Sequence, residues 1–365
     1  MKMLRQTVLA AALAAGGGCA VAQDADTPAD TPADPMAATP FSGERLTEGL
    51  GVVNVLSADF ERSRAFLQGA MGLSFEPQEL RGREAERVRE AFGLPGEGPL
   101  RAGVFHQPAV EGETFVRVFE GPGDLPPLRP GMDSRFTGTL GYGFPMADIE
   151  RRIAISELWG FPTVAGLQRM QFPRADGSLY WVGETHFEGP DDVLVLGVDR
   201  YENNAIGPVD PALGLGGVAY SSFLVDDLAR NESFFADVLG LEKRRDITFN
   251  SSGDGGMVNM RKGEEVVFQQ WFAPGASSNY LVLMQFVDDP EARRPSGVSG
   301  FEGHGVGGWS FETEDLNRVA EAWREWSGKA APDTVELDLP EVGRVRSLVL
   351  RSPDGIVVDV FERVQ

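Results

Sequence analysis

The 365-residue sequence is poor in cysteine, histidine and positive charge, with one Cys, three His, and 33 Lys plus Arg against 55 Asp plus Glu. One cysteine excludes a disulfide framework and a thiolate metal cluster. The formal net charge of -22 repels phosphate backbones and anionic lipids, so we expect neither nucleic-acid binding nor a basic membrane patch. Outside the N-terminal segment we expect no transmembrane segment. A glycine-rich phosphate loop, a nucleophile-elbow serine and a paired-histidine helix are also absent from the sequence.

Residues 1–22 have the pattern of a secretory signal, with two basic residues, the short apolar run TVLAAALAA and a small-x-small site. We expect cleavage near Ala22 and a periplasmic or secreted mature protein. Cys19 follows the apolar run and leaves lipoprotein anchoring as an alternative. Residues 23–40 are dominated by Asp, Ala and Pro and predict a solvated tether, so the folded part begins near Phe41.

The chain contains an internal duplication. Residues 52–73 (VVNVLSADFERSRAFLQGAMGL) align without a gap with residues 220–241 (YSSFLVDDLARNESFFADVLGL), at a shift of 168 positions. A second pair of segments repeats at a shift of 167, which aligns Gly141 with Gly308 and Trp159 with Trp326. Two independent pairs with nearly the same offset indicate duplication of a unit of about 165 residues, itself made of two modules.

Each of the four modules has the same local pattern. An alternating, strand-like run ends near an Asp, at position 59, 148, 227 or 315, whose carboxylate can accept from the first-turn N–H groups of a helix. Further strand-like runs follow each helix, as at residues 265–272 and 280–287 of the third module. The pattern predicts a strand, a helix and three more strands, four times over.

This order of elements resembles that of the vicinal oxygen chelate superfamily. The Met-Gly-Leu or Leu-Gly-Leu segment that ends the helix in modules one and three adds to the resemblance. That superfamily includes glyoxalase I, bleomycin-resistance proteins and extradiol ring-cleaving dioxygenases. The resemblance covers about residues 51–362 and is most specific at 225–241, 307–316 and 352–362.

The resemblance implies an α+β fold of four βαβββ modules arranged as two duplicated pairs, each pair forming a curved mixed sheet around a cavity. From chain order we expect the first module pair in residues 41–205 and the second pair in residues 211–365.

The resemblance also implies where metal-using relatives place their ligands, because a His or Gln near the start of the first strand joins a Glu on the last strand. The matching first-strand positions here are Val52, Gly141, Tyr220 and Gly308, and none of them is His or Gln. We therefore expect no usual His metal site and no cofactor.

An alternative keeps a divalent metal at a non-standard site in the first half. Such a site would use Glu120, His106 and His186. The competing interpretation is that the two histidines are partly exposed strand residues.

The second half offers a polar and aromatic set for ligand binding. We expect Tyr220, Gln285 and Asp359 to converge on one place, and strand alternation adds polar neighbours to them. The predicted ligand-binding residues are Tyr220, Ser222, Gln285, Ser310 and Trp271.

Asp359 and Glu312 are the candidate catalytic residues, because carboxyls that share a pocket can act as acid and base. The competing interpretation is that both are solvated or paired with arginines.

The sequence thus predicts an exported protein that binds a small, preferably ring-bearing, organic molecule in a module-pair cavity. The alternative is a lyase, isomerase or ring-cleaving oxygenase that uses carboxylates or an atypical metal. A third interpretation is a platform for protein contacts. The substrate, the oligomeric state and the pair that holds the open cavity are not determined by the sequence.

Overall fold

The computed structural model describes residues 41–110, 112, 114–173, 178–201, 205–251, 260–287, 297–339 and 341–364. The expected signal peptide, the tether and Cys19 lie outside these residues. None of the helices in the described ranges is both long and apolar enough to cross a bilayer.

The described elements follow the four-module pattern. Module one contains β1 (Leu50–Ser57), α1 (Phe60–Arg64) continued by the π-helix η1 (Ala65–Ala70), β2 (Ser74–Leu80), α2 (Arg83–Phe92), β3 (Leu100–His106) and β4 (Phe115–Glu120). After the short 3-10 helix η2 (Pro130–Met132), module two contains β5 (Gly138–Pro145), α3 (Ile149–Leu158), β6 (Gln168–Pro173), β7 (Leu179–Glu188), the 3-10 helix η3 (Pro190–Asp192) and β8 (Leu194–Asp199).

The second half repeats this order. Module three contains β9 (Tyr220–Leu224), α4 (Leu228–Ser233) continued by the π-helix η4 (Phe234–Val238), β10 (Glu242–Asn250), β11 (Glu265–Phe272) and β12 (Tyr280–Phe286). Module four contains β13 (Gly305–Glu312), α5 (Leu316–Ser327), β14 (Val335–Leu339), β15 (Gly343–Arg351) and β16 (Val357–Arg363).

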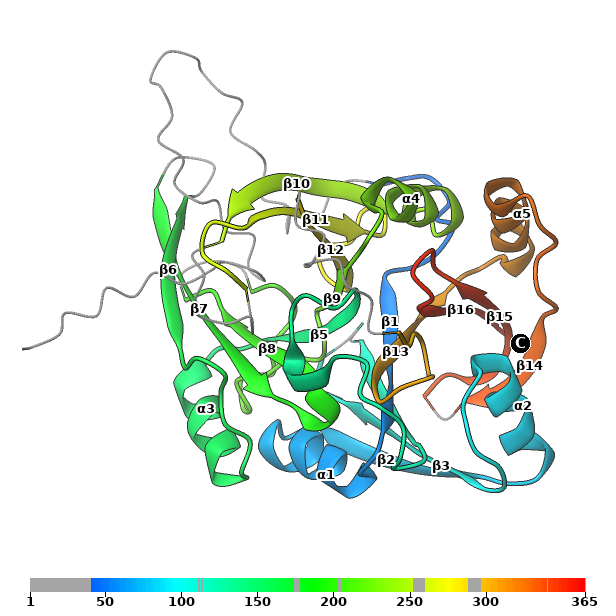
Figure 1. The fold of residues 1–365 in the computed structure, drawn as a ribbon, viewed down its shortest axis with the longest axis horizontal. Coiled ribbons are helices and arrows are strands. Elements are labelled where there is room, and N and C mark those ends of the chain that lie inside the picture. The colour runs from blue at the N-terminus through cyan, green and yellow to red at the C-terminus, as the bar shows by residue number, and fades with distance from the viewer. Residues whose placement is uncertain are drawn as a thin grey trace, which may run out of the picture.

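The strands form two eight-stranded sheets, each curled and of mixed direction (Figure 1). Sheet I has the order β14-β15-β16-β13-β1-β4-β3-β2, and sheet II has the order β10-β11-β12-β9-β5-β8-β7-β6. The predicted α+β fold of four modules in two paired, curved sheets is confirmed.

The pairing expected from chain order is wrong. Module one shares sheet I with module four, through antiparallel β1 and β13. Module two shares sheet II with module three, through antiparallel β5 and β9. The ranges 41–205 and 211–365 therefore do not correspond to two separate sheets, although the duplication itself stays as predicted from the repeat.

Four aspartates begin the main helices as the sequence predicts. The side chains of Asp59, Asp148, Asp227 and Asp315 accept hydrogen bonds from the backbone N–H groups of Arg62, Arg151, Arg230 and Arg318, at 3.0, 3.2, 3.0 and 3.3 Å. Each carboxylate satisfies a donor that the first helical turn leaves without a partner.

Helices cover one face of each sheet, and the opposite face carries a separate hydrophobic cluster. Along β9, Phe223 joins the hydrophobic cluster under the helices, whereas Tyr220 and Leu224 join a separate cluster on the other side. Successive strand residues point to opposite faces, so Ser221 lies with Phe223 and Ser222 lies with Tyr220. We call the face opposite to the helices the inner face, because each sheet curls toward it (Figure 1).

Consecutive modules pack against each other through their helices, which explains the sheet pairing. The Phe66 and Phe161 rings, from modules one and two, are 5.0 Å apart, and the Phe234 and Trp326 rings, from modules three and four, are 5.3 Å apart. Neighbouring modules along the chain thus pack together on their helical sides, while their first strands pair with modules of the other half.

Two aspartates in turns hold the sheets together at equivalent places. Asp354, before β16 of sheet I, accepts from Asn231 Nδ2 on α4 at 2.7 Å. Asp191, before β8 of sheet II, accepts from the backbone N–H of Ala58, before α1, at 3.0 Å. Burial raises the pKa of both carboxyls. Each turn thus fixes the strand-to-helix connection of the preceding module.

Helix α2 is an insertion that the sequence analysis missed. Its Ala85, Val88 and Phe92 pack into a hydrophobic cluster with Phe119 and Leu337 on the inner face of sheet I, where α2 lies beside β14 (Figure 1). The apolar spacing of these three α2 residues was the available signal.

Replacing Asp354 with Ala should lower the free energy of unfolding by about 1–2 kcal/mol, because the buried amide of Asn231 loses its carboxylate acceptor. Urea unfolding followed by tryptophan fluorescence measures the change. The matched control is Asp333→Ala in an exposed loop, for which we expect a change within about 0.5 kcal/mol. Equal effects of the two substitutions would show that the turn does not fix the sheets.

Candidate functional site

Three aromatic rings stack on the inner face of sheet II. The Tyr220 and Tyr280 rings are 5.1 Å apart and nearly parallel, at 21°, and Tyr280 continues the stack to Phe272 at 4.5 Å. Tyr220 also lies over Gly143 of β5, where an added Cβ would approach the Tyr220 ring to 2.2 Å. The glycine is therefore required for this ring position, and the stack belongs to the buried apolar cluster of this face.

A carboxyl and an imidazole lie on the same face. Glu184 and His186 are two residues apart on β7, are 0% and 2% exposed, and have Oε1 and Nε2 at 3.3 Å. Burial lowers the pKa of His186 to about 4, so the imidazole is neutral at neutral pH. Sequence reasoning missed Glu184, although its alternation with His186 was visible.

The Tyr220 hydroxyl is a buried polar group without a hydrogen-bond partner in the described part of the chain. Burial, followed by the neighbouring Tyr280 and Glu184, raises its pKa well above the ordinary value, so the hydroxyl stays protonated and can donate. A buried donor left without a partner is costly, which makes this hydroxyl a candidate binding group.

An arginine also reaches this inner face. Arg200 Nη2 donates to the Tyr180 hydroxyl at 2.8 Å, with the guanidinium 4.9 Å from the Tyr180 ring. We define the sheet II site as this pair together with Glu184, His186, Tyr220 and Tyr280. It offers an aromatic wall, a neutral imidazole, a carboxyl and a phenol donor.

The structure separates the predicted ligand-binding residues. Tyr220 and Ser222 share the inner face of sheet II. Gln285 lies on β12 at an odd number of residues from Tyr280, so its side chain is on the opposite face of the sheet. Its Nε2 donates to the backbone oxygen of Asp226 at 2.6 Å. Asp359, together with Ser310, lies on sheet I. The expected convergence of Tyr220, Gln285 and Asp359 is wrong.

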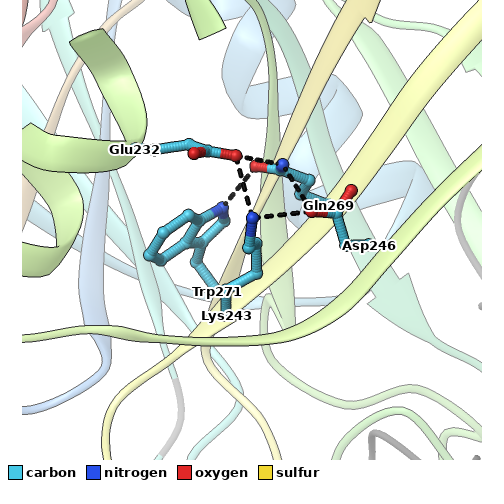
Figure 2. Close-up of polar contacts among 5 residues, drawn as sticks. All are labelled: Glu232, Lys243, Asp246, Gln269 and Trp271. Carbon is cyan, nitrogen blue, oxygen red and sulfur yellow. Dashed lines mark hydrogen bonds and ion pairs between the residues drawn. The ribbon is translucent and has the colours of Figure 1, made fainter. Parts of the chain in front are cut away.

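Trp271 lies on the helix-covered face of sheet II, in a polar cluster that Figure 2 shows. Its Nε1 donates to Gln269 Oε1 at 3.1 Å. Lys243 Nζ contacts Glu232 of α4 at 2.9 Å and Asp246 of β10 at 2.6 Å. These contacts fasten α4 to sheet II, so Trp271 has a packing role away from the inner face.

The two candidate catalytic carboxyls do not form an acid–base pair. Glu312 accepts two hydrogen bonds from Arg363 at 2.6 and 2.9 Å near the protein surface. Asp359 is fully buried and is attracted by the buried Arg117. Pairing with an arginine therefore describes Glu312, whereas Asp359 feels the charge of Arg117 without a direct ion pair among the described residues.

The non-standard metal site is also not formed. His186 lies in sheet II, whereas His106 and Glu120 lie at opposite ends of the β3–β4 hairpin in sheet I. His106 Nε2 is 3.2 Å from Glu76, and Glu120 is 3.9 Å from Arg101. Within the described ranges, no group of three or more His, Cys, Asp or Glu could hold a metal ion.

The residues present do not fit the metal that the fold implies. On the inner face of sheet I, the guanidinium of Arg117 lies next to Asn54 of the first strand. The sheet II site has one imidazole and one carboxyl as metal-binding groups.

A cleft of about 1090 Å³ lies at the β2 edge of sheet I. Glu120 lines it, together with Arg64, Arg101 and Phe75. Arg101 is already paired with Glu61 and lies 4.2 Å from the Phe60 ring, and Arg64 stacks on Phe75 at 4.5 Å. Because these charges are satisfied within the protein, the cleft is a weaker candidate than the sheet II site.

The buried neutral His186 should make stability depend on pH. Its folded pKa of about 4 lies below the ordinary 6.5, so the unfolded chain takes up the proton first as the pH falls. Stability is then lost as the pH falls from about 6.5, by about 2 kcal/mol between pH 7.5 and pH 5. Urea unfolding at both pH values should show this loss in the wild type and a correspondingly smaller loss in His186→Gln. If His186→Gln and the control His106→Gln lost the same unfolding free energy between these pH values, the assignment of the loss to His186 would be contradicted.

Comparison with known proteins supports the fold. Residues 217–360 match the family model described as Glyoxalase/Bleomycin resistance protein/Dioxygenase superfamily. Glyoxalase I from Zea mays has a TM-score of 0.55 to this chain at 13% sequence identity, covering 86% of this chain and 92% of that chain. A mutant of the same maize protein gives 0.57 at 12% identity with the same coverage.

At these identities the structural similarity shows the fold alone, and no curated protein matches the sequence. Residues 217–360 therefore match the Glyoxalase/Bleomycin resistance protein/Dioxygenase superfamily, and the chain as a whole shares the fold of glyoxalase I.

Proposed function

We propose that the protein binds a small, ring-bearing organic molecule at the inner face of sheet II. The observation that carries the proposal is the buried Tyr220 hydroxyl, which has no hydrogen-bond partner among the described residues and stands on a stack of aromatic rings. A ligand ring would pack against the stack, and a ligand oxygen would accept from Tyr220.

The neighbouring groups support recognition of a polar ring substituent. His186 is neutral and Glu184 is its close neighbour, so the site can both accept and donate hydrogen bonds. Binding sites of this kind combine apolar walls with a few polar groups that fix orientation.

The inner face of sheet I is less suited to a ligand. Helix α2 fills it with apolar side chains, and Arg117 is fully buried there. The two duplicated inner faces therefore differ in what they offer, and this difference supports placing the proposed binding site on sheet II.

Proton-transfer catalysis by a lyase or isomerase is the second candidate, favoured by the Glu184–His186 contact. Histidine and carboxyl groups are the usual proton-transfer groups of enzymes, but the lowered pKa of about 4 makes His186 a weak base at neutral pH. The Asp359 and Glu312 pair no longer supports this candidate, because the structure separates them.

Binding can be tested with a panel of phenols, aromatic acids and dicarbonyl compounds, using thermal shift and then calorimetry. Tyr220→Phe removes only the hydroxyl and should weaken a bound ligand about tenfold, equal to about 1.4 kcal/mol, while leaving the unfolding free energy unchanged or higher. Tyr142→Phe, in the buried core on the helix-covered face, is the matched control and should leave affinity unchanged. Equal affinity in both variants would refute a site at Tyr220.

Export is a separate proposal and rests on the signal pattern of residues 1–22. N-terminal sequencing of the mature protein recovered from the periplasm or the medium should begin at Gln23. Recovery of an intact N-terminus in the cytoplasm would contradict it, and a lipid-modified Cys19 would establish the lipoprotein alternative instead.

A further inference from the structure

The inner face of sheet I contains a closed cluster of charged and polar side chains. Arg117 on β4 is ion-paired with Glu341, in the turn before β15, and their side chains are 0% and 1% exposed. Arg117 Nη1 also donates to Asn54 Oδ1 at 3.0 Å, and Asn54 Nδ2 donates to Ser310 Oγ at 3.0 Å. Asp359 on β16 pairs in register with Ser310 and is itself 0% exposed.

Apolar side chains close the cluster from water. The Arg117 guanidinium is 5.6 Å from the Phe92 ring of α2 and 5.8 Å from the Phe119 ring of β4. Both rings belong to the hydrophobic cluster that α2 completes on this face. The charges therefore lie in a low-dielectric interior, where each needs a partner.

The charges of this cluster do not balance when all groups are ionised. It contains one guanidinium, that of Arg117, and two carboxyls, those of Glu341 and Asp359. The neighbouring strands β1, β13 and β15 contribute Asn54, Ser310 and Ser347, which are neutral. Arg117 and Asp359 also act on each other through their charges. Full ionisation would leave one buried negative charge uncompensated, which is strongly unfavourable.

We propose that the inner face of sheet I binds one proton, held by the carboxyl of Asp359 at neutral pH. Glu341 is the ionised partner because it contacts the guanidinium directly. Asp359 takes up a proton to become a neutral carboxylic acid, and its O–H can donate to a hydroxyl of Ser310 or Ser347. Arg117 then balances one carboxylate, and the cluster has no net charge.

The pKa values agree with this arrangement. Burial raises the pKa of Asp359, and this outweighs the opposing effects of Arg117, Ser310 and Ser347. Burial lowers the pKa of the Arg117 guanidinium to about 10, and Asp359 opposes that shift. Arg117 therefore stays charged at neutral pH, as the proposed charge balance requires.

The direction of the pH dependence follows. Because the folded protein holds a proton on Asp359 that the unfolded chain releases near the ordinary Asp pKa, the folded state binds more protons over the interval between the two pKa values. Stability contributed by this group therefore falls as the pH rises through that interval. This direction is opposite to that expected for a carboxylate stabilised by an ion pair.

The test compares Asp359→Asn with Glu341→Gln by thermal unfolding at several pH values. Asn is a neutral replacement for the neutral acid, so the unfolding temperature of Asp359→Asn should lie within a few degrees of the wild-type value at pH 7. At higher pH it should rise relative to that of the wild type. Glu341→Gln removes the partner of Arg117 and should unfold at a clearly lower temperature. Asp338→Asn, an exposed substitution on β14, controls for the loss of one negative charge.

Infrared spectroscopy gives a readout that packing alone would not change. The wild type at pH 7 should show the C=O stretch of a protonated, water-excluded carboxylic acid, and the band should be absent from Asp359→Asn and present in Asp338→Asn. The proposal is overturned by a missing band in the wild type. It is equally overturned if Asp359→Asn lowers the unfolding temperature as much as Glu341→Gln does. Failure of Asp359→Asn to fold, while Glu341→Gln folds, would also overturn it.

Discussion

Helix-face packing between consecutive modules is the constraint on which the architecture depends. Phe66 against Phe161 and Phe234 against Trp326 join modules that follow each other along the chain. The Asp191 and Asp354 turns reinforce the same two contacts by fixing the connection before each partner helix. Each module thus buries its helix against its neighbour, and its first strand completes a sheet with a module from the other half.

This arrangement creates two inner faces that the duplication has filled differently. In sheet I, an inserted helix and a buried arginine occupy the face. In sheet II, stacked tyrosines and the Glu184–His186 contact occupy it. The contrast is one of physical chemistry, because a buried guanidinium needs a carboxylate partner, whereas stacked rings need only apolar neighbours. The two duplicated halves thus provide inner faces of different chemistry.

Exposed and buried charges also contribute differently to stability. The acidic surface carries many exposed ion pairs, such as Glu312 with Arg363, which stabilise little because water screens them. The buried charges are fewer and matter more, since Arg117 and Glu341 lie where screening is absent. Lys243, shown in Figure 2, is intermediate between exposed and buried charges, because it is half-buried and joins α4 to β10.

The sequence by itself determined the four modules, their helix-capping aspartates and the fold class, because alternation, caps and glycine stops are local signals that repeat. It also placed Tyr220 and Ser222 on one strand face. Only the tertiary structure decided which modules share a sheet, since any first-strand edge can pair with another. It likewise separated Gln285 from Tyr220, because a shift of one residue along a strand moves a side chain to the opposite face. Partners of buried charges, such as Glu341 for Arg117, come from distant segments and have no signal in the local sequence.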